Sequence, residues 1–144
     1  MPGAYRTLNL PLFAVPDTPP TMIRNILDAA HIHPSIHDKI AASHADIVQE
    51  VQAAIAANPI VVVGMAQNPF PRKARQALDA AGLSYKYLGY GSYLGGWRLR
   101  NALKMWTGWP TFPMIFVKGM LVGGAADLQR LLDSGELRLL LAAP

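Results

Sequence analysis

The chain has 144 residues, of which 51% are hydrophobic, enough for the core of one ordinary domain. It contains no cysteine, which excludes disulfides, thiolate catalysis and metal or iron–sulfur sites with cysteine ligands. It also lacks a run of about 18 apolar residues, and prolines interrupt its first apolar segment, so we expect neither a membrane span nor a signal peptide. We therefore expect a cytoplasmic protein.

The formal net charge of +4 is unevenly distributed. Residues 1–58 hold three lysines and arginines against five aspartates and glutamates, whereas residues 59–144 hold ten against four. The second part is the one that can attract an anion, although a basic surface facing solvent explains the same count. The charged fraction of 15% is low, which favours a surface that meets a protein partner or a second copy in a homodimer.

The first 58 residues divide into an arm and a helical extension. Residues 1–20 contain five prolines and no periodicity, which predicts an extended arm. Residues 21–58 predict three helices: one within 21–33, a second capped by Ser35, and a third capped by Ser43 and ended by a proline. Apolar residues of the third helix fall on one stripe, namely Ile47, Val48, Val51 and Ile55.

From residue 59 the pattern alternates between strands and helices. A buried β-branched strand is predicted at 60–64, and a hairpin at 112–124 with its turn at Lys118 and Gly119. The other elements are predicted as a helix at 69–81, a strand at 83–90, a helix at 97–106 and a final helix within 125–137 that ends at Gly135. This order, β-α-β-α-β-β-α, predicts a mixed sheet with helices on its faces.

Two motifs give the second part of the chain a family resemblance. The sequence "WPTFP" at 109–113 is followed by a V-x-G-x-x-x-G-G hairpin from Val117 to Gly124, and then by a helix that contains an aspartate. On these motifs residues 60–141 resemble glutaredoxins, and the monothiol branch in particular. The resemblance implies an α/β fold of the thioredoxin-like class, a four-stranded mixed sheet flanked by helices. Residues 59–144 would form this glutaredoxin-like domain, with an added N-terminal helical segment.

The resemblance also locates the position of the family's active-site cysteine, which this chain lacks. Glutaredoxins carry a cysteine between the first strand and the first helix of this region, where it exchanges with glutathione disulfides or, with glutathione, ligates a [2Fe–2S] cluster. The matching residues here are Asn68, Pro69, Phe70 and Pro71. Asn is a preferred N-cap and Pro is favoured directly after it, so this stretch is predicted to begin a helix without supplying a thiolate. We predict no catalytic residue.

The glutathione site of the family is matched in part. The positions that correspond to its ligand contacts are Arg100, Lys104, Thr111, Phe112, Pro113, Gly124 and Asp127. A cis Pro113 would present the backbone of Phe112 to an extended peptide. Two polar contacts are missing, since the family's lysine before the motif falls on Met65 or Ala66 and its acidic residue falls on Ala126. Glutathione is the candidate ligand, and the alternative is that the two cations simply face solvent.

Two further clusters are candidate binding sites. Four histidines lie in the N-terminal helical segment, but Pro34 breaks the helix between His33 and His37, so we predict no metal site. Three tryptophans close to Arg98 and Arg100 could stack on bases beside phosphate contacts. They are better explained as packing residues, so no nucleic acid is expected.

The sequence therefore favours a redox-inactive, glutaredoxin-related protein with a binding or regulatory role, acting through the Thr111–Pro113 backbone and a basic groove. Enzymatic activity is not expected. One alternative is a thiol-free enzyme in which bound glutathione supplies the sulfur, although only Asn68 or Tyr5 is available to activate it. The other is a structural or oligomeric interaction module built on the N-terminal helices.

Overall fold

The computed structural model describes residues 24–144, so the arm predicted at 1–20 lies outside the described part. Contacts divide the chain into two units, Met1–His33 and Pro34–Pro144. In the first unit the described residues form one short 3-10 turn, η1 (Ala29–His31). The elements that position the candidate site all belong to the second unit.

The helix predicted within 21–33 is wrong over its described residues. Residues 24–28 are not helical, and the apolar side chains of Ile26 and Leu27 are each 66% exposed. A short amphipathic segment gains most of its helical stability by packing its apolar face. Because these side chains are exposed, no packing stabilises a helix here, and the apolar periodicity alone wrongly predicted one.

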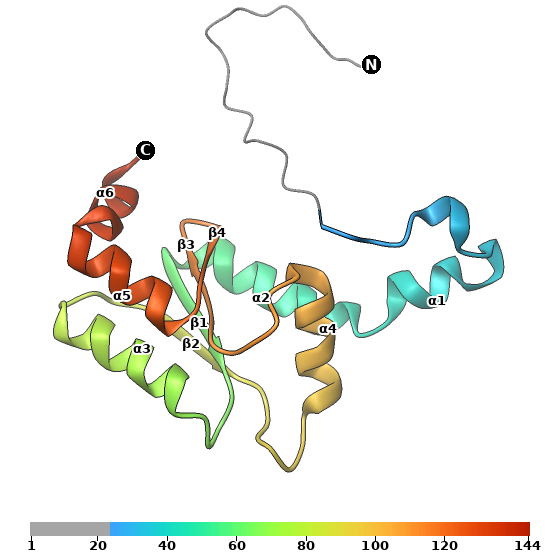
Figure 1. Cartoon of the computed structure of the whole chain (residues 1–144), viewed down its shortest axis with the longest axis horizontal. Helices are drawn as coiled ribbons and strands as arrows, with labels where there is room; N and C mark the ends of the chain where they lie inside the picture. The colour runs from blue at the N-terminus through green and yellow to red at the C-terminus, as the bar shows by residue number, and fades with distance from the viewer. Residues whose placement is uncertain (1–23) are drawn as a thin grey trace, which may run out of the picture. The chain divides into compact units, whose positions relative to one another are not determined.

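A four-stranded mixed sheet forms the centre of the second unit (Figure 1). Its strands are β1 (Ile60–Gly64), β2 (Lys86–Gly89), β3 (Met114–Val117) and β4 (Met120–Gly123), in the spatial order β2-β1-β3-β4. β1 runs parallel to β2, whereas β1–β3 and β3–β4 are antiparallel pairs. The predicted hairpin is confirmed, since positive φ angles at Lys118 (52°) and Gly119 (83°) suit a tight two-residue turn.

Helices cover both faces of this sheet (Figure 1). They are α2 (Ala45–Ala57), α3 (Pro69–Ala80), α4 (Trp97–Thr107), α5 (Ala125–Ser134) and α6 (Glu136–Ala142). Two short elements precede them, η2 (Pro34–Ile36) and α1 (His37–Ala42), and neither contains a buried residue. α2 and α4 pack on one face, and α3, α5 and α6 pack on the other. None of the helices within residues 24–144 combines the length and the apolar character needed to cross a bilayer.

Alternation along β1 builds two separate cores. Val61 and Val63 point into the core beneath α2 and α4, whereas Ile60 and Val62 point into the core beneath α3, α5 and α6. All five residues of β1 are buried, as the continuous β-branched run predicted. In α2, Ile47 and Val51 are buried in the first core, so α2 shares the core of the segment predicted as the 59–144 domain.

The structure corrects two predicted helix caps. α1 begins at His37 with Ile36 at the N-cap, so the helix does not start from Ser35. α2 begins at Ala45 with His44 at the N-cap, and Ser43 instead ends α1. His44 has a φ of 51°, which makes the chain turn sharply between the two helices, and a Ser-x-x-Asp pattern alone does not predict that turn.

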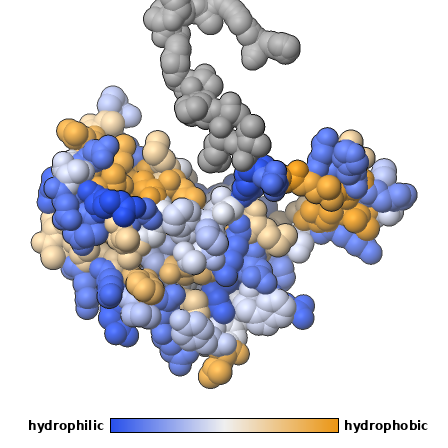
Figure 2. All heavy atoms as spheres, viewed as in Figure 1, coloured by the Kyte–Doolittle hydropathy of each residue, from blue (hydrophilic) through white to orange (hydrophobic). Residues whose placement is uncertain are grey.

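Helix α6 was not predicted. Gly135, with a φ of 81°, ends α5 and also begins α6, so the predicted end of the helix is confirmed but the chain continues helically beyond it. Leu137 is fully buried in the second core. Arg138 Nη2 donates to the carbonyl of Ala81 at 2.8 Å and ties α6 to the end of α3. Apolar side chains stay on the surface elsewhere, for instance at α1, where Ile40 is 49% exposed (Figure 2).

A side-chain hydrogen bond joins α2 to the end of β2. The Tyr90 hydroxyl donates to Glu50 Oε1 at 2.8 Å. Burial raises the pKa of the Tyr90 phenol above its usual value near 10, and the hydrogen bond and negative charge of Glu50 raise it further. The protonated phenol is therefore the form that stabilises the fold.

This pair predicts a loss of stability in strong base. Above a pH near 10, Tyr90 ionises in the unfolded chain but keeps its proton in the folded one, so the free energy of unfolding falls as the pH rises. The free energy of unfolding of Tyr90→Phe should fall less steeply as the pH rises, as measured by urea unfolding at a series of pH values. Tyr93→Phe is the control, because Tyr93 is 66% exposed. Equal slopes for wild type and Tyr90→Phe would contradict the expectation.

Candidate functional site

The candidate site begins at Asn68, where β1 leads into α3. Asn68 is the N-cap of α3, and its side-chain Oδ1 accepts a hydrogen bond from the Phe70 backbone N–H at 2.9 Å. Pro69 occupies the first turn, where it removes no intrahelical bond. The predicted cap is confirmed, and an amide therefore stands at the start of α3, at the position that matches the family cysteine.

Pro71 closes this turn against β1. Its ring is buried, and a Cβ added to Gly64 would lie 2.7 Å from the Pro71 Cβ. That distance is shorter than side chains tolerate, so the close approach of α3 to β1 requires glycine at residue 64. The turn around Asn68 is thus held by packing on the α3 side of the sheet.

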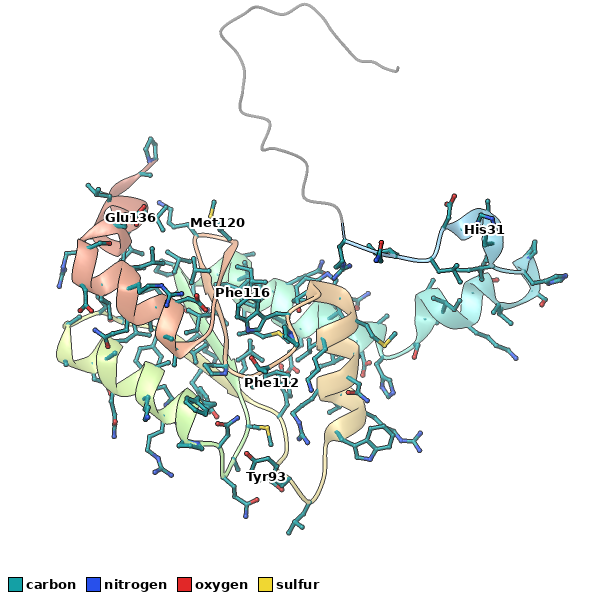
Figure 3. The ribbon with its side chains drawn as sticks, viewed as in Figure 1. His31, Tyr93, Phe112, Phe116, Met120 and Glu136 are labelled. Carbon is teal, nitrogen blue, oxygen red and sulfur yellow. The ribbon has the colours of Figure 1, made fainter. Side chains whose placement is uncertain are left out.

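Asn68 also contacts the loop before β3. Its Nδ2 donates to the carbonyl of Phe112 at 3.4 Å, a long hydrogen bond across 44 residues of sequence. The Phe112–Pro113 peptide bond is cis, as predicted. Phe112 is only 5% exposed and packs into the core beneath α2 and α4 (Figure 3). The start of α3 and the backbone of Phe112 therefore form one cluster.

The predicted cation pair on α4 is divided between two environments. The Lys104 ammonium lies 5.8 Å from the centroid of the Phe112 ring, so it stands beside the Asn68–Phe112 cluster. Arg100 is only 8% exposed, and its Nη1 donates to the carbonyls of Tyr90 at 3.0 Å and Gly95 at 2.7 Å. Its guanidinium thus braces the loop between β2 and α4, while Lys104 is the cation next to Phe112.

The remaining predicted residues flank the loop and the start of α5. Thr111 is exposed and directly precedes Phe112. Asp127 accepts a hydrogen bond from the Gly124 backbone N–H at 2.9 Å and caps α5. Its other carboxylate oxygen pairs with Arg130. Asp127 therefore has two partners and positions the start of α5. The sequence did not predict this role, because Asp127 stands out in it only as a shifted match to the family's acidic ligand contact.

Sequence reasoning missed the loop that Arg100 braces. Gly91 and Gly96 adopt positive φ angles of 70° and 78°, and Ser92 and Gly95 form an isolated bridge between them. The Ala66 N–H donates to the Gly91 carbonyl at 2.9 Å, which ties this loop to the chain just before Asn68. The signal was present as a dense group of glycines, but it predicted only a turn.

The Asn68–Phe112 cluster can bind a ligand through hydrogen bonds and through one positive charge. It offers amide and carbonyl groups at Asn68 and Phe112 and an ammonium at Lys104. The whole chain lacks a thiol, and no three His, Asp or Glu side chains converge within residues 24–144. The cluster can hold a ligand through polar contacts, but it supplies no sulfur nucleophile.

Comparisons with known proteins agree with this arrangement. Residues 60–122 match the family model described as Glutaredoxin. A "Glutaredoxin-like protein" of Dictyostelium discoideum is 46% identical over 94 residues, which cover 65% of this chain and 76% of that relative. The "Probable monothiol glutaredoxin GrlA" of Legionella pneumophila is 34% identical over 73 residues, covering 51% of this chain and 79% of the relative.

Solved structures extend the likeness to the fold. The crystal structure of a wheat glutaredoxin superimposes with a TM-score of 0.61 and 28% identity, covering 71% of this chain and 94% of that one. The four-stranded mixed sheet and its flanking helices are therefore those of the thioredoxin-like class. On its sequence, its sheet and these relatives, the chain belongs to the glutaredoxin family, and it does so without a cysteine.

Proposed function

We propose that this chain is a redox-inactive glutaredoxin that binds a short acidic peptide, with glutathione as the first candidate. The observation that carries this proposal is the double role of Asn68, which caps α3 and hydrogen-bonds to Phe112. An amide that makes both contacts holds the start of α3 next to the loop before β3 without a thiol. Binding is the role for which such an arrangement is suited, and we place it in the cytoplasm.

The ligand would lie along the loop before β3. In this proposal the backbone of Phe112 pairs with an extended peptide, and the Thr111 hydroxyl donates to it. Lys104 pairs with a ligand carboxylate, because its ammonium already stands beside Phe112. Pro113 and Gly124 shape the floor, and Arg100 and Asp127 position the loops on either side through contacts that they already make.

Affinity is expected to be weak. Two polar contacts of the family are absent, one at Met65 or Ala66 and one at Ala126, and each lost charge-assisted bond weakens binding by roughly 1.5–3 kcal/mol. We expect a dissociation constant on the order of 1 mM for glutathione, which corresponds to a binding free energy of about −4 kcal/mol.

Removing the ammonium of Lys104 tests the proposed carboxylate contact. We expect Lys104→Met to lower the affinity for reduced glutathione about tenfold, because one charge-assisted hydrogen bond is lost. Isothermal titration calorimetry on wild type and variant measures the change. Lys86→Met is the matched control, since Lys86 is exposed on β2. Equal affinity of wild type and Lys104→Met would remove Lys104 from the site.

The homodimer and the thiol-free enzyme remain separate proposals. Sedimentation that gives the mass of one chain, 15.6 kDa, would contradict the dimer. Transferase and disulfide-exchange assays that stay at background for the unmodified protein would contradict the enzyme.

A further inference from the structure

A second hollow lies along α4, and neither Asn68 nor Phe112 lines it. It is a groove of about 590 Å³ between α2, α4 and the end of α1, and α2 packs directly against α4. Its apolar walls are formed by Ile40, Val48, Trp97, Met105 and Trp106. Of these, Trp97 is 56% exposed and Met105 is 70% exposed, so much of the apolar wall faces solvent.

The groove is separate from the site described above. On α4, Arg98, Ala102 and Met105 line the groove and fall on one side of the helix at spacings of four and three residues. Arg100 and Lys104 do not line the groove, and they contact the loop after β2 and Phe112 instead. The two sites therefore use different residues of one helix, although Lys104 lies one turn after Asn101, which lines the groove.

The charge of the groove is one-sided. Among residues 24–144, Arg98 is the one lysine or arginine that lines the groove, His44 is its other titratable side chain, and no aspartate or glutamate lines it. The Arg98 guanidinium lies 5.0 Å from the centroid of the Trp97 ring, so a cation and an aromatic face stand together at one end. Amide side chains at Gln49, Gln52 and Asn101 supply further polar contacts.

We propose that this groove binds a small amphipathic anion, a carboxylate on an aromatic or aliphatic body. The body would lie along the wall of Trp97, Met105 and Trp106, and the carboxylate would pair with Arg98. The volume falls in the range of about 300–1,000 Å³ that small-molecule sites occupy. Among the described lining residues, Arg98 favours an anion over a neutral ligand, and the lack of an acidic side chain disfavours a cation.

The three tryptophans allow a direct test by NMR. Trp97 and Trp106 line the groove, whereas Trp109 lies outside it, where its ring is 3.8 Å from a Cβ added to Gly124. Titration of the ¹⁵N-labelled protein with 4-phenylbutyrate should shift the indole N–H signals of Trp97 and Trp106 saturably, and should leave that of Trp109 in place. The neutral 4-phenylbutanamide should bind about tenfold more weakly, because it lacks the charge.

Two variants separate the charge from the apolar wall. Arg98→Gln should weaken 4-phenylbutyrate about tenfold and abolish its advantage over the amide. Asn101→Phe, at an exposed position, should fill the groove and weaken both probes. Lys86→Gln on β2 should bind both probes as the wild type does.

Four results would overturn the proposal. The first is equal affinity of the wild type for the two probes, and the second is an Arg98→Gln variant that binds 4-phenylbutyrate as tightly as the wild type. The third is a shift of all three tryptophan signals together. The fourth is a protein mass in solution that changes with dilution, together with an Arg98→Gln variant that does not respond to the probe. The last result would mean that a second copy, rather than a small anion, covers the groove.

Discussion

Asn68→Cys is expected to gain thiol–disulfide exchange with glutathione disulfides, which the unmodified chain cannot perform because it has no thiol. The new sulfur would lie at the N-terminus of α3, where the free N–H groups and the helix dipole favour the thiolate. Its exchange should be about tenfold faster at neutral pH than that of an unperturbed cysteine, which is only a few per cent ionised. The hydroxyethyl disulfide assay with glutathione measures this gain.

Asn68→Ser is the matched control for this substitution. Serine keeps an N-cap oxygen but has no sulfur, so this variant should stay at background. Asn68→Cys should also lose about 1 kcal/mol of unfolding free energy, because the bonds to Phe70 and Phe112 are removed. If Asn68→Cys folds and shows no more exchange than Asn68→Ser, then residue 68 does not occupy a position that can activate a nucleophile.

Gly91→Ala is expected to be the most destabilising small substitution in the loop between β2 and α4. Gly91 has a φ of 70°, and an added Cβ would clash with the Gly95 carbonyl and lie 2.8 Å from the Gly96 Cα. Both neighbours are backbone atoms, so relief requires moving the loop and breaking the hydrogen bonds that Arg100 makes to it. A loss on the order of 3 kcal/mol follows, measured by urea unfolding.

Gly95→Ala provides the comparison within the same loop. An added Cβ at Gly95 meets no atom within 4 Å, so this variant should unfold within about 0.5 kcal/mol of the wild type. Equal stability of Gly91→Ala and Gly95→Ala would mean that the loop adjusts freely. Its geometry, and the buried position of Arg100 that depends on it, would then need another explanation.

Much of the fold was predictable because its signals are local. The β-branched run at 60–64, the Asn68–Pro69 helix start and the Lys118–Gly119 turn each depend on a few neighbouring residues, and each is confirmed. The errors arose where tertiary packing decides. The stripe around Ile26 and Leu27 is exposed and not helical, whereas α6 forms because Leu137 is buried in the second core.

The candidate site was harder to predict because its contacts join distant parts of the chain. The bond from Asn68 to Phe112 spans 44 residues, and no sequence spacing signals it. Arg100 and Lys104 were predicted as ligand contacts because they match two cations of the family's glutathione site. Arg100 is instead buried beneath a loop, where its guanidinium donates hydrogen bonds to two loop carbonyls. The spacing of Arg100 and Lys104 on the helix does not predict that an arginine, with its several donors, will bind the loop while the lysine does not.

Glutathione binding is tested most directly by titrating the unmodified, ¹⁵N-labelled protein with reduced glutathione and following the backbone amide signals. We expect saturable shifts at millimolar glutathione that cluster at Lys104, Thr111 and Phe112, with no oxidation or reduction of the ligand. Signals of these three residues that stay fixed throughout the titration would contradict the proposed binding site.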